Sequence, residues 1–238
     1  MKAGLGGMQA VILAGGLATR LRSRTLTTPK ALIEVAGKPF IGWQLELIRD
    51  SGFEKVLLCI GHLGERIREY VGDGRRFGLG VSYSEDGPRL LGTAGALRRA
   101  LDDLQPTFLV TYGDSYLPFD YSSPLRDLRA HPEALGTLAV FQNRGRWDVS
   151  NVELSGELVA RYAKGSRDAE LEYIDYGAIA LRREVIRSIL EGEPHGLDQI
   201  QTELAQQRRL RALIAEERFF EIGSEQGISD LEQRLRGH

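Results

Sequence analysis

Short, largely apolar runs alternate with amphipathic segments along the first half of the chain. The predicted strands occupy residues 10–13, 55–60, 79–84 and 107–112. Each run is bounded by glycine, proline or charge, a pattern typical of strands in a buried sheet. Between the strands, apolar residues at helical spacing predict helices over 39–51 and 65–71. Strand and helix therefore alternate, which predicts parallel strands in one sheet with helices on both faces.

The second half of the chain predicts a further set of strands joined by polar turns. These strands are expected over 135–141, 149–154, 158–162 and 172–181. A surface helix is expected over 122–131, and Pro132 is expected to end it. A last helix over 225–235 carries apolar residues on one face and is expected to pack.

Composition limits the classes of function. The 238 residues are 42% hydrophobic and 27% charged, and a net charge of −2 gives no general attraction to nucleic acid or to an anionic membrane. Apolar runs fall short of the roughly 20 residues of a membrane span, and no signal-peptide pattern opens the chain, so a cytoplasmic location is expected. The lone Cys59 excludes an internal disulfide and a cysteine metal cluster. We expect one domain over 8–238, after a mobile leader at 1–7.

The loop after the first strand carries the strongest chemical signal. It begins with Leu13, Ala14, Gly15 and Gly16 and then becomes basic, with Arg20, Arg22, Arg24 and Lys30 within eleven residues. Glycine lets backbone N–H groups approach an anion closely, so the loop suits a polyphosphate. A simple turn followed by solvated arginines is the alternative interpretation.

The order of residues in this loop resembles a known signature. The run L-A-G-G-x-x-T-R-L-R followed by T-P-K resembles the sugar-1-phosphate nucleotidylyltransferases, with Thr19, Arg20, Pro29 and Lys30 in register. The resemblance implies an α/β, Rossmann-like three-layer nucleotidyltransferase fold with a mixed, mostly parallel sheet flanked by helices. It also implies that Arg20 and Lys30 contact the phosphates of a nucleoside triphosphate, and that Leu13, Ala14, Gly15, Gly16 and Thr19 bind the nucleotide.

A second motif follows the strand at 79–84. The run L-G-T-A-G-A at 91–96 is similar to the segment on which the family binds a base and ribose, and Gly92 would allow close approach. Thr93 is expected as a helix N-cap. Glu85 and Asp86 are candidates for contacting base edges. The alternative is a helix that needs small residues only for packing.

Two carboxylates match the family's metal site. Gly113 and Asp114 follow the strand at 107–112, where open α/β sheets bind ligands, and the family's aspartate in this place binds Mg²⁺. The later run F-F-E-I-G-S resembles the family's F-x-D-I-G-T, with Glu221 in place of the second metal-binding aspartate. The resemblance therefore implies Mg²⁺ as the cofactor, held by Asp114 and Glu221.

The second half resembles the part of the family that binds the sugar phosphate. Lys164 falls where the family has a lysine that contacts this phosphate, and Tyr112, Glu172, Asp175 and Gly177 are predicted to line the sugar site. Solvated acids on a half-buried strand are the alternative for Glu172 and Asp175.

The expected reaction joins an NTP and a sugar 1-phosphate into a nucleotide sugar and pyrophosphate. The R-L-R-S form of the loop favours GTP with a manno-configured hexose or heptose 1-phosphate, and UTP remains an alternative. A phosphocholine or phospho-alcohol cytidylyltransferase and a non-catalytic nucleotide sensor also stay open, the latter because Ala18 and Glu221 depart from the family pattern. A nicotinamide oxidoreductase is disfavoured because the glycine spacing is not G-x-G-x-x-G. The sequence leaves the oligomeric state open.

Overall fold

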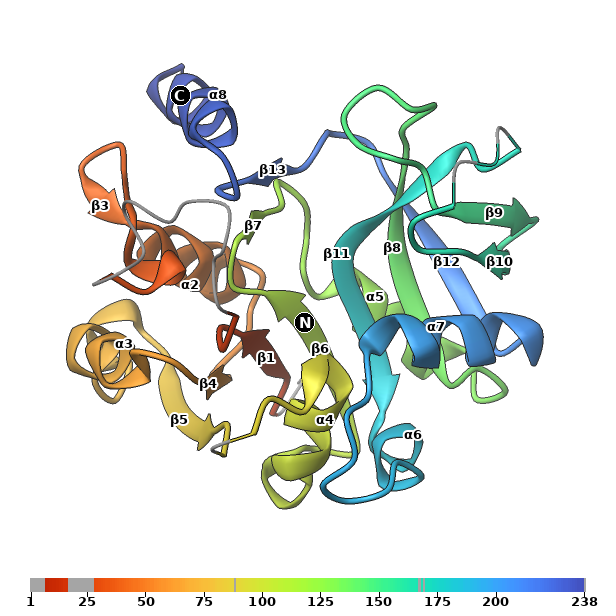
Figure 1. Cartoon of the computed structure of the whole chain (residues 1–238), viewed down its shortest axis with the longest axis horizontal. Helices are drawn as coiled ribbons and strands as arrows, with labels where there is room; N and C mark the ends of the chain where they lie inside the picture. The colour runs from red at the N-terminus through yellow and green to blue at the C-terminus, as the bar shows by residue number, and fades with distance from the viewer. Residues whose placement is uncertain (1–6, 17–27, 88, 167, 169, 238) are drawn as a thin grey trace, which may run out of the picture.

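A nine-stranded sheet organises the part of the chain that the structure describes (Figure 1). The structure is a computed structural model, and it describes residues 7–16, 28–87, 89–166, 168 and 170–237. The sheet order is β5-β4-β1-β6-β11-β8-β12-β10-β9. The strands are β1 (Gln9–Leu13), β4 (Lys55–Ile60), β5 (Gly80–Glu85), β6 (Thr107–Tyr112), β8 (Gly136–Gln142), β9 (Val152–Ser155), β10 (Leu158–Tyr162), β11 (Tyr173–Arg182) and β12 (Leu210–Ala215). The predictions for Thr19, Arg20 and the leader up to residue 6 lie outside the described residues.

The sheet has a parallel half and a mixed half. Strands β5, β4, β1 and β6 are parallel neighbours. Strand β11 joins β6 and β8 in antiparallel fashion, β12 is parallel to β8, and β10 is antiparallel to β12 and β9. All the strands of this sheet except β11 and β10 therefore run in one direction, which confirms the mixed, mostly parallel sheet.

Helices cover both faces of the sheet, as the alternating pattern predicted. One face packs against α2 (Phe40–Asp50), α3 (Gly64–Val71) and α5 (Ser123–Ala130). The other packs against α4 (Gly92–Arg99), α6 (Arg183–Arg187) and α7 (Leu197–Gln206). Successive residues of β1 alternate between the two cores, Ala10 and Ile12 on one side and Val11 on the other, as the two-residue period of a strand requires.

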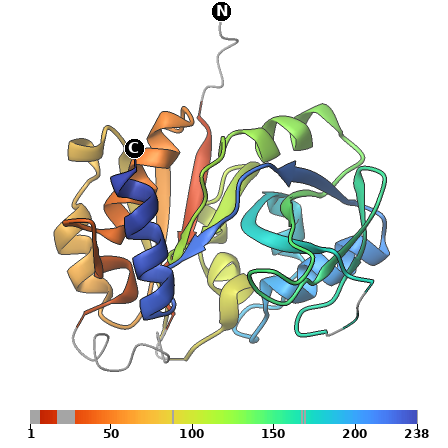
Figure 2. The ribbon, with the colours of Figure 1, turned by 90° about the horizontal axis from the view of Figure 1, so that it is seen from above.

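The C-terminal helix α8 (Glu225–Arg236) packs on the N-terminal half of the chain (Figures 1 and 2). It follows β13 (Phe220–Glu221), which pairs with β7 (Ser115–Tyr116). Its residues Ile228 and Leu231 share a small core with α2 and with β2 (Glu34–Val35), which pairs with β3 (Lys38–Pro39). The chain end is thereby held beside the loops that follow β6.

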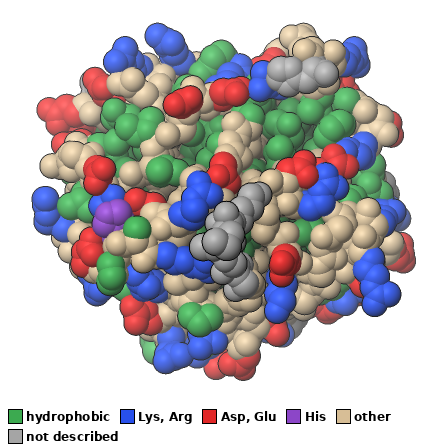
Figure 3. Space-filling view, turned by 180° about the vertical axis from the view of Figure 1, so that it is seen from behind, with side chains coloured by type: hydrophobic (Ala, Val, Ile, Leu, Met, Phe, Trp, Pro, Cys, Tyr) green, Lys and Arg blue, Asp and Glu red, His purple; other side chains and the backbone are tan. Residues whose placement is uncertain are grey.

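Most predicted boundaries agree with the structure to within two residues, and one cap was wrong. Pro39 is the N-cap of α2, and Gly52, with φ of 84°, follows its end. The helix expected to begin after Thr93 instead starts at Gly92, with Leu91 as its N-cap. No described helix has the length and apolar character to cross a bilayer. Lysine, arginine and acidic side chains are interspersed over the face shown in Figure 3, in keeping with the small net charge.

Candidate active site

Three parallel strands end together and bring their following loops to one edge of the sheet. Leu13, the last residue of β1, lies opposite Cys59 of β4 and Tyr112 of β6. Just beyond these residues, the Ala14 N–H donates to the Cys59 carbonyl at 2.8 Å and the Gly113 N–H to the Leu13 carbonyl at 2.9 Å. A Cβ on Gly113 would lie 3.1 Å from the Ala14 Cα atom, so glycine allows the two loops to pack backbone to backbone.

A cavity of about 430 Å³ opens at this edge, and we call it the nucleotide-side cavity after the ligand that the sequence motifs predict for its lining. It contains most of the residues predicted to bind a nucleotide. Its lining includes Leu13, Ala14, Gly15, Gly16, Lys30, Asp86, Gly92, Thr93, Tyr112, Gly113 and Asp114. The loop after β1 and the first turn of α4 are therefore brought together, as the two sequence motifs predicted.

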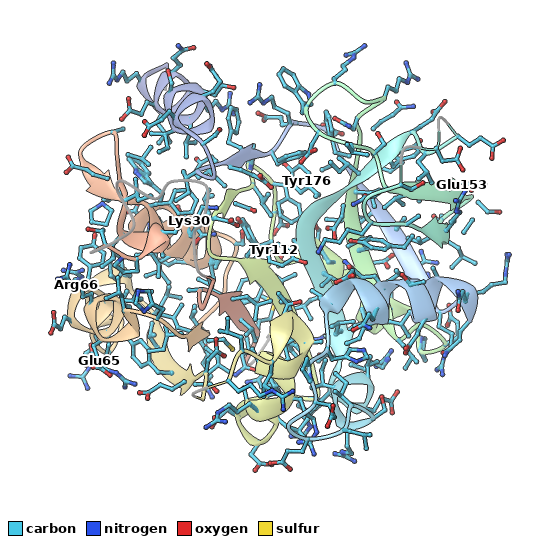
Figure 4. The ribbon with its side chains drawn as sticks, viewed as in Figure 1. Lys30, Glu65, Arg66, Tyr112, Glu153 and Tyr176 are labelled. Atoms are coloured by element: carbon cyan, nitrogen blue, oxygen red, sulfur yellow. The ribbon has the colours of Figure 1, made fainter. Side chains whose placement is uncertain are left out.

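A second cavity, of about 590 Å³, adjoins the first, and we call it the sugar-side cavity after the ligand that the resemblance implies for Lys164, Asp175 and Gly177. Its lining includes Lys164, Asp175, Gly177, Glu221, Asp148 and Tyr162. The two cavities share Lys30, Tyr112 and Asp114. Figure 4 shows Tyr112 and Tyr176 near the centre of the molecule and Lys30 to their left, on the side of α2.

An ion pair stands where the two cavities meet. Lys30 opens a 3₁₀ turn, Lys30–Leu32, directly after Pro29, and its Nζ lies 2.5 Å from Oδ2 of Asp114. The side chains are 20% and 34% exposed and line both cavities, so a ligand in either cavity could contact them. A Cβ on Gly223 would lie 3.3 Å from the lysine Nζ, so the absence of a side chain there leaves room for the ammonium group.

The predicted metal-binding carboxylates are brought together by the pairing of β7 and β13. Glu221 lies opposite Ser115, and the Ile222 N–H donates to the Asp114 carbonyl at 3.0 Å. Asp114 and Glu221 both line the sugar-side cavity. Among the described residues no three His, Cys, Asp or Glu side chains form a group that could hold a metal by themselves. Two carboxylates nevertheless fit Mg²⁺, because this ion usually takes its remaining oxygens from phosphates and water.

Asp175 carries a half-buried carboxylate at the sugar-side cavity. It accepts hydrogen bonds from the Gly177 N–H at 2.9 Å, from Gln201 Nε2 at 2.8 Å and from the Tyr162 hydroxyl at 3.1 Å. Burial raises the pKa of Asp175 above its usual value, and these hydrogen bonds offset part of that rise. Gly177 has φ of 96° where the pairing of β11 with β8 shifts register, so the bulge turns Asp175 and its neighbours toward the cavity.

Tyr112 separates the two cavities and stays protonated. Burial raises its pKa well above the ordinary value, and the negative charge of Asp175 raises it further. Its hydroxyl is therefore a neutral hydrogen-bonding group at any physiological pH. The side chain lines both cavities, so it can contact a ligand on either side.

The structure places two predicted residues outside both cavities. The Glu85 carboxylate, which was expected at a base edge, forms an ion pair with Arg68 and lines neither cavity. Glu172 is exposed before β11, with Gln142 Nε2 at 3.4 Å from its carboxylate, and it does not line the sugar-side cavity. Asp86 does line the nucleotide-side cavity, and burial raises its pKa, with the nearby charge of Arg99 acting in the opposite direction.

Lys164 and Gly92 are in the expected places but have protein partners. Lys164 lines the sugar-side cavity, and its Nζ lies 3.6 Å from Oδ1 of Asp198. A Cβ on Gly92 would lie 2.7 Å from the His195 carbonyl oxygen. The backbone of His195 therefore occupies the space that a side chain at Gly92 would need.

Sequence reasoning did not identify Gln201, Asp148 or Tyr162 as part of the site. They come from α7, from the loop after β8 and from the end of β10. An apolar face with Leu197, Ile200 and Leu204 marks α7 as a helix, and a buried glutamine on that face is the one signal that could have drawn attention to it.

Comparisons with known proteins agree with this arrangement. Residues 9–151 match the nucleotidyl transferase family model. The chain is 40% identical over 128 residues to N-acetylmuramate alpha-1-phosphate uridylyltransferase of Neisseria meningitidis, covering 53% of this chain and 55% of that protein. It is 28% identical over 217 residues to D-glycero-alpha-D-manno-heptose 1-phosphate guanylyltransferase of Campylobacter jejuni, covering 91% of this chain and 95% of that protein.

The fold is shared with a solved structure over nearly all of both chains. The crystal structure of HddC from Yersinia pseudotuberculosis has a TM-score of 0.78 at 20% identity and covers 96% of this chain and 99% of its own. The chain spans about half the length of the Neisseria relative and less of some others. Because the family match extends over more than half of this chain and includes the loop after β1, Lys30 and Asp114, the chain belongs to the nucleotidyl transferase family.

Proposed function

We propose that the protein transfers a nucleoside monophosphate from an NTP to a sugar 1-phosphate and releases pyrophosphate. The observation that carries this proposal is the meeting of two cavities at Lys30, Tyr112 and Asp114. A reaction between two phosphorylated substrates needs two binding sites whose phosphate ends meet at shared charged groups. The curated relatives are named as transferases acting on sugar 1-phosphates, which supports the same substrate class.

The substrates are assigned to the cavities by their linings. The glycine-rich loop after β1 and the N-terminal turn of α4 suit the nucleotide, because their backbone N–H groups can approach phosphates and ribose. The sugar-side cavity offers Lys164 for the sugar phosphate and Asp175 for a sugar hydroxyl. Arg20, which lies outside the described residues, is assigned to the triphosphate by the loop motif.

The proposed chemistry is a single in-line displacement. An oxygen of the sugar phosphate forms a bond to the α-phosphorus of the NTP, and the bond from that phosphorus to the departing pyrophosphate oxygen breaks. The attacking oxygen is already ionised at neutral pH, so the protein needs no general base. Lys30 neutralises charge at the α-phosphate, because the entering sugar phosphate and the departing pyrophosphate are both negatively charged there. Mg²⁺, held by Asp114 and Glu221, would supply further neutralisation of the phosphate oxygens.

The base and the sugar are proposed as guanine and a manno-configured hexose or heptose. A carboxylate can accept two hydrogen bonds from N1–H and N2–H₂ of guanine, and Asp86 is a carboxylate in the nucleotide-side cavity. The guanylyltransferase of Campylobacter, matched over nearly its whole length, supports this choice. The uridylyltransferase of Neisseria, more similar over a shorter span, supports UTP as the second candidate.

The test is pyrophosphate release from each of four NTPs against a panel of sugar 1-phosphates, with phosphocholine added to the panel, in the presence of Mg²⁺. We expect release only when both substrates are present, with GTP and a manno-configured sugar as the preferred pair. Preference for phosphocholine with CTP would identify the phospho-alcohol branch instead. Nucleotide binding without release for every pair would identify a sensor.

A further inference from the structure

Helix α7 is attached at its start to the nucleotide-side cavity. The Leu197 N–H, at the first position of α7, donates to Oγ1 of Thr93 at 2.7 Å. Two residues before Leu197, the His195 carbonyl accepts hydrogen bonds from the N–H groups of Ala94 and Gly95, at 3.0 and 3.1 Å. These contacts join segments about 100 residues apart in the chain. The start of α7 is therefore fixed relative to the loop that is proposed to hold the nucleotide.

The same helix directs two side chains toward the charged groups of the sugar-side cavity. Asp198 lies 3.6 Å from Lys164, and Gln201 donates to Oδ2 of Asp175 at 2.8 Å. The two residues are three positions apart and therefore share one face of α7. Neither residue lines the nucleotide-side or the sugar-side cavity, whereas Lys164 and Asp175 both line the latter. Any influence of Asp198 or Gln201 on a ligand thus acts through Lys164 or Asp175.

Gln201 is kept in the core at a cost to stability. Its side chain is 1% exposed, and its Oε1 atom has no hydrogen-bond partner in the described part of the chain. A buried acceptor without a partner destabilises the folded state, and an apolar side chain of similar size would avoid this cost. The amide's other end, Nε2, is the one that contacts Asp175. Packing alone does not explain a glutamine at this position.

The donors around Asp175 fix both of its oxygens. Oδ1 accepts from the Gly177 N–H, and Oδ2 accepts from Tyr162 and Gln201. The tyrosine comes from β10, the glycine from β11 itself and the glutamine from α7. Without Gln201 the carboxylate would keep one donor on each oxygen, and it would lose its connection to the helix that is attached to the nucleotide-side cavity.

We infer that Gln201 is a positioning residue for the sugar 1-phosphate: it holds Asp175 in the orientation that accepts a sugar hydroxyl, at a place set by the attachment of α7 to Thr93. This inference rests on the proposed function. It assigns a role in substrate recognition to a buried side chain of α7 that touches no substrate. A merely structural glutamine would behave differently, because its removal would affect folding rather than the affinity for the sugar.

The test replaces Gln201 with methionine, which has a similar size and no amide. We expect KM for the sugar 1-phosphate to rise about 10-fold, the effect of losing one hydrogen bond to a charged group, while KM for the NTP changes less than about twofold. The thermal midpoint should stay equal or rise, because the unpaired Oε1 is also removed. Glu203→Gln, at an exposed position of the same helix, is the matched control and should change neither value.

A double-mutant comparison tests the route through Asp175. In an Asp175→Ala background, Gln201→Met should cause no further rise in the sugar KM, because the group that it positions is gone. Gln201→Glu is a second variant of nearly the same shape, and it should also weaken sugar binding because its carboxylate repels Asp175. An unchanged sugar KM in Gln201→Met, or a clear fall in its thermal midpoint with KM intact, would overturn the inference.

Binding can be compared without turnover. Calorimetric titration of a sugar 1-phosphate into wild-type protein and Gln201→Met should show the same roughly 10-fold difference in Kd. A wild-type protein that binds the sugar phosphate but releases no pyrophosphate would contradict the proposed function and leave the positioning role standing. Equal Kd values in the two proteins would contradict the positioning role whether or not turnover is observed.

Discussion

Replacing Asp114 by asparagine should separate catalysis from folding. The change removes one negative charge at the junction of the two cavities while keeping nearly the same side-chain shape. It takes away a proposed oxygen ligand of Mg²⁺ and the partner of Lys30. The backbone bond from the Ile222 N–H to the Asp114 carbonyl does not involve the side chain, so the pairing of β7 with β13 should survive.

The expected sizes of the two effects differ widely. The Lys30–Asp114 pair is 20% and 34% exposed, and ion pairs with this degree of exposure typically contribute only about 0–1 kcal/mol to the free energy of unfolding. For a chain of this size, about 1 kcal/mol shifts Tm by roughly 2–4 °C. Losing a group that stabilises transition-state charge typically lowers kcat by about 10²–10³-fold. Turnover should therefore fall by orders of magnitude while Tm changes by a few degrees.

The assay pairs pyrophosphate release at saturating substrates with a thermal unfolding curve. Asp102→Asn is the matched control, because Asp102 is an exposed carboxylate before β6 whereas Asp114 follows that strand. The control should keep wild-type turnover. Turnover of Asp114→Asn within about threefold of wild type would refute the assignment, since the proposed metal ligand would then carry no catalytic charge. A loss of turnover with a collapsed Tm would point to a structural role instead.

Three further substitutions test separate parts of the account. Lys30→Ala should lower kcat by about 10²-fold at saturating NTP, and a change in KM alone would make Lys30 a binding residue only. Asp86→Asn should reduce the preference for GTP over UTP by about 10-fold or more, measured as the ratio of kcat/KM values, with UTP turnover little changed. Asp127→Asn tests stability: burial raises the pKa of Asp127, but hydrogen bonds from Arg211 and Thr137 outweigh this and hold the pKa below its usual value. The ion pair with the buried Arg211 therefore stabilises the fold above the unfolded pKa of about 3.9 and ceases to do so as pH falls through the lower folded value. The variant should be less stable by about 3 kcal/mol at pH 7. Denaturant unfolding should show this difference shrinking as pH falls below the unfolded pKa of about 3.9.

Local patterns predicted the parallel half of the fold because each of its signals lies within a short stretch of sequence. The apolar run at β1 and the glycines after it place a strand and its loop without reference to distant residues. Parallel strands bring their C-terminal ends to one edge, so Gly15 and Asp114 could be predicted to lie near each other. The orientation of Glu85 could have been predicted in the same way. It shares a face of β5 with Tyr83, and Arg68 stacks over Tyr83 on that face.

The remaining parts of the site depend on contacts between distant segments. Glu221 lies beside Asp114 because β13 pairs with β7, across more than 100 residues, and no local pattern encodes that pairing. The N–H groups of Ala94 and Gly95 donate to the His195 carbonyl, in the turn before α7. The small residues that the sequence suggested for contact with a base therefore also pack against the chain's own backbone. Gln201 belongs to α7, a helix that was not predicted from the sequence, and it contacts Asp175 only because β11 brings that residue next to α7.

The destination of the α-phosphorus tests the central claim most directly. The protein, Mg²⁺, a sugar 1-phosphate and an NTP labelled with ³²P at the α-position are incubated, and the products are separated. The account predicts that the label moves into a nucleotide sugar, that unlabelled pyrophosphate forms in equal amount, and that neither product appears when the sugar 1-phosphate is left out. Label that stays in the NTP with every sugar phosphate, or that appears as free nucleoside monophosphate without one, would contradict it.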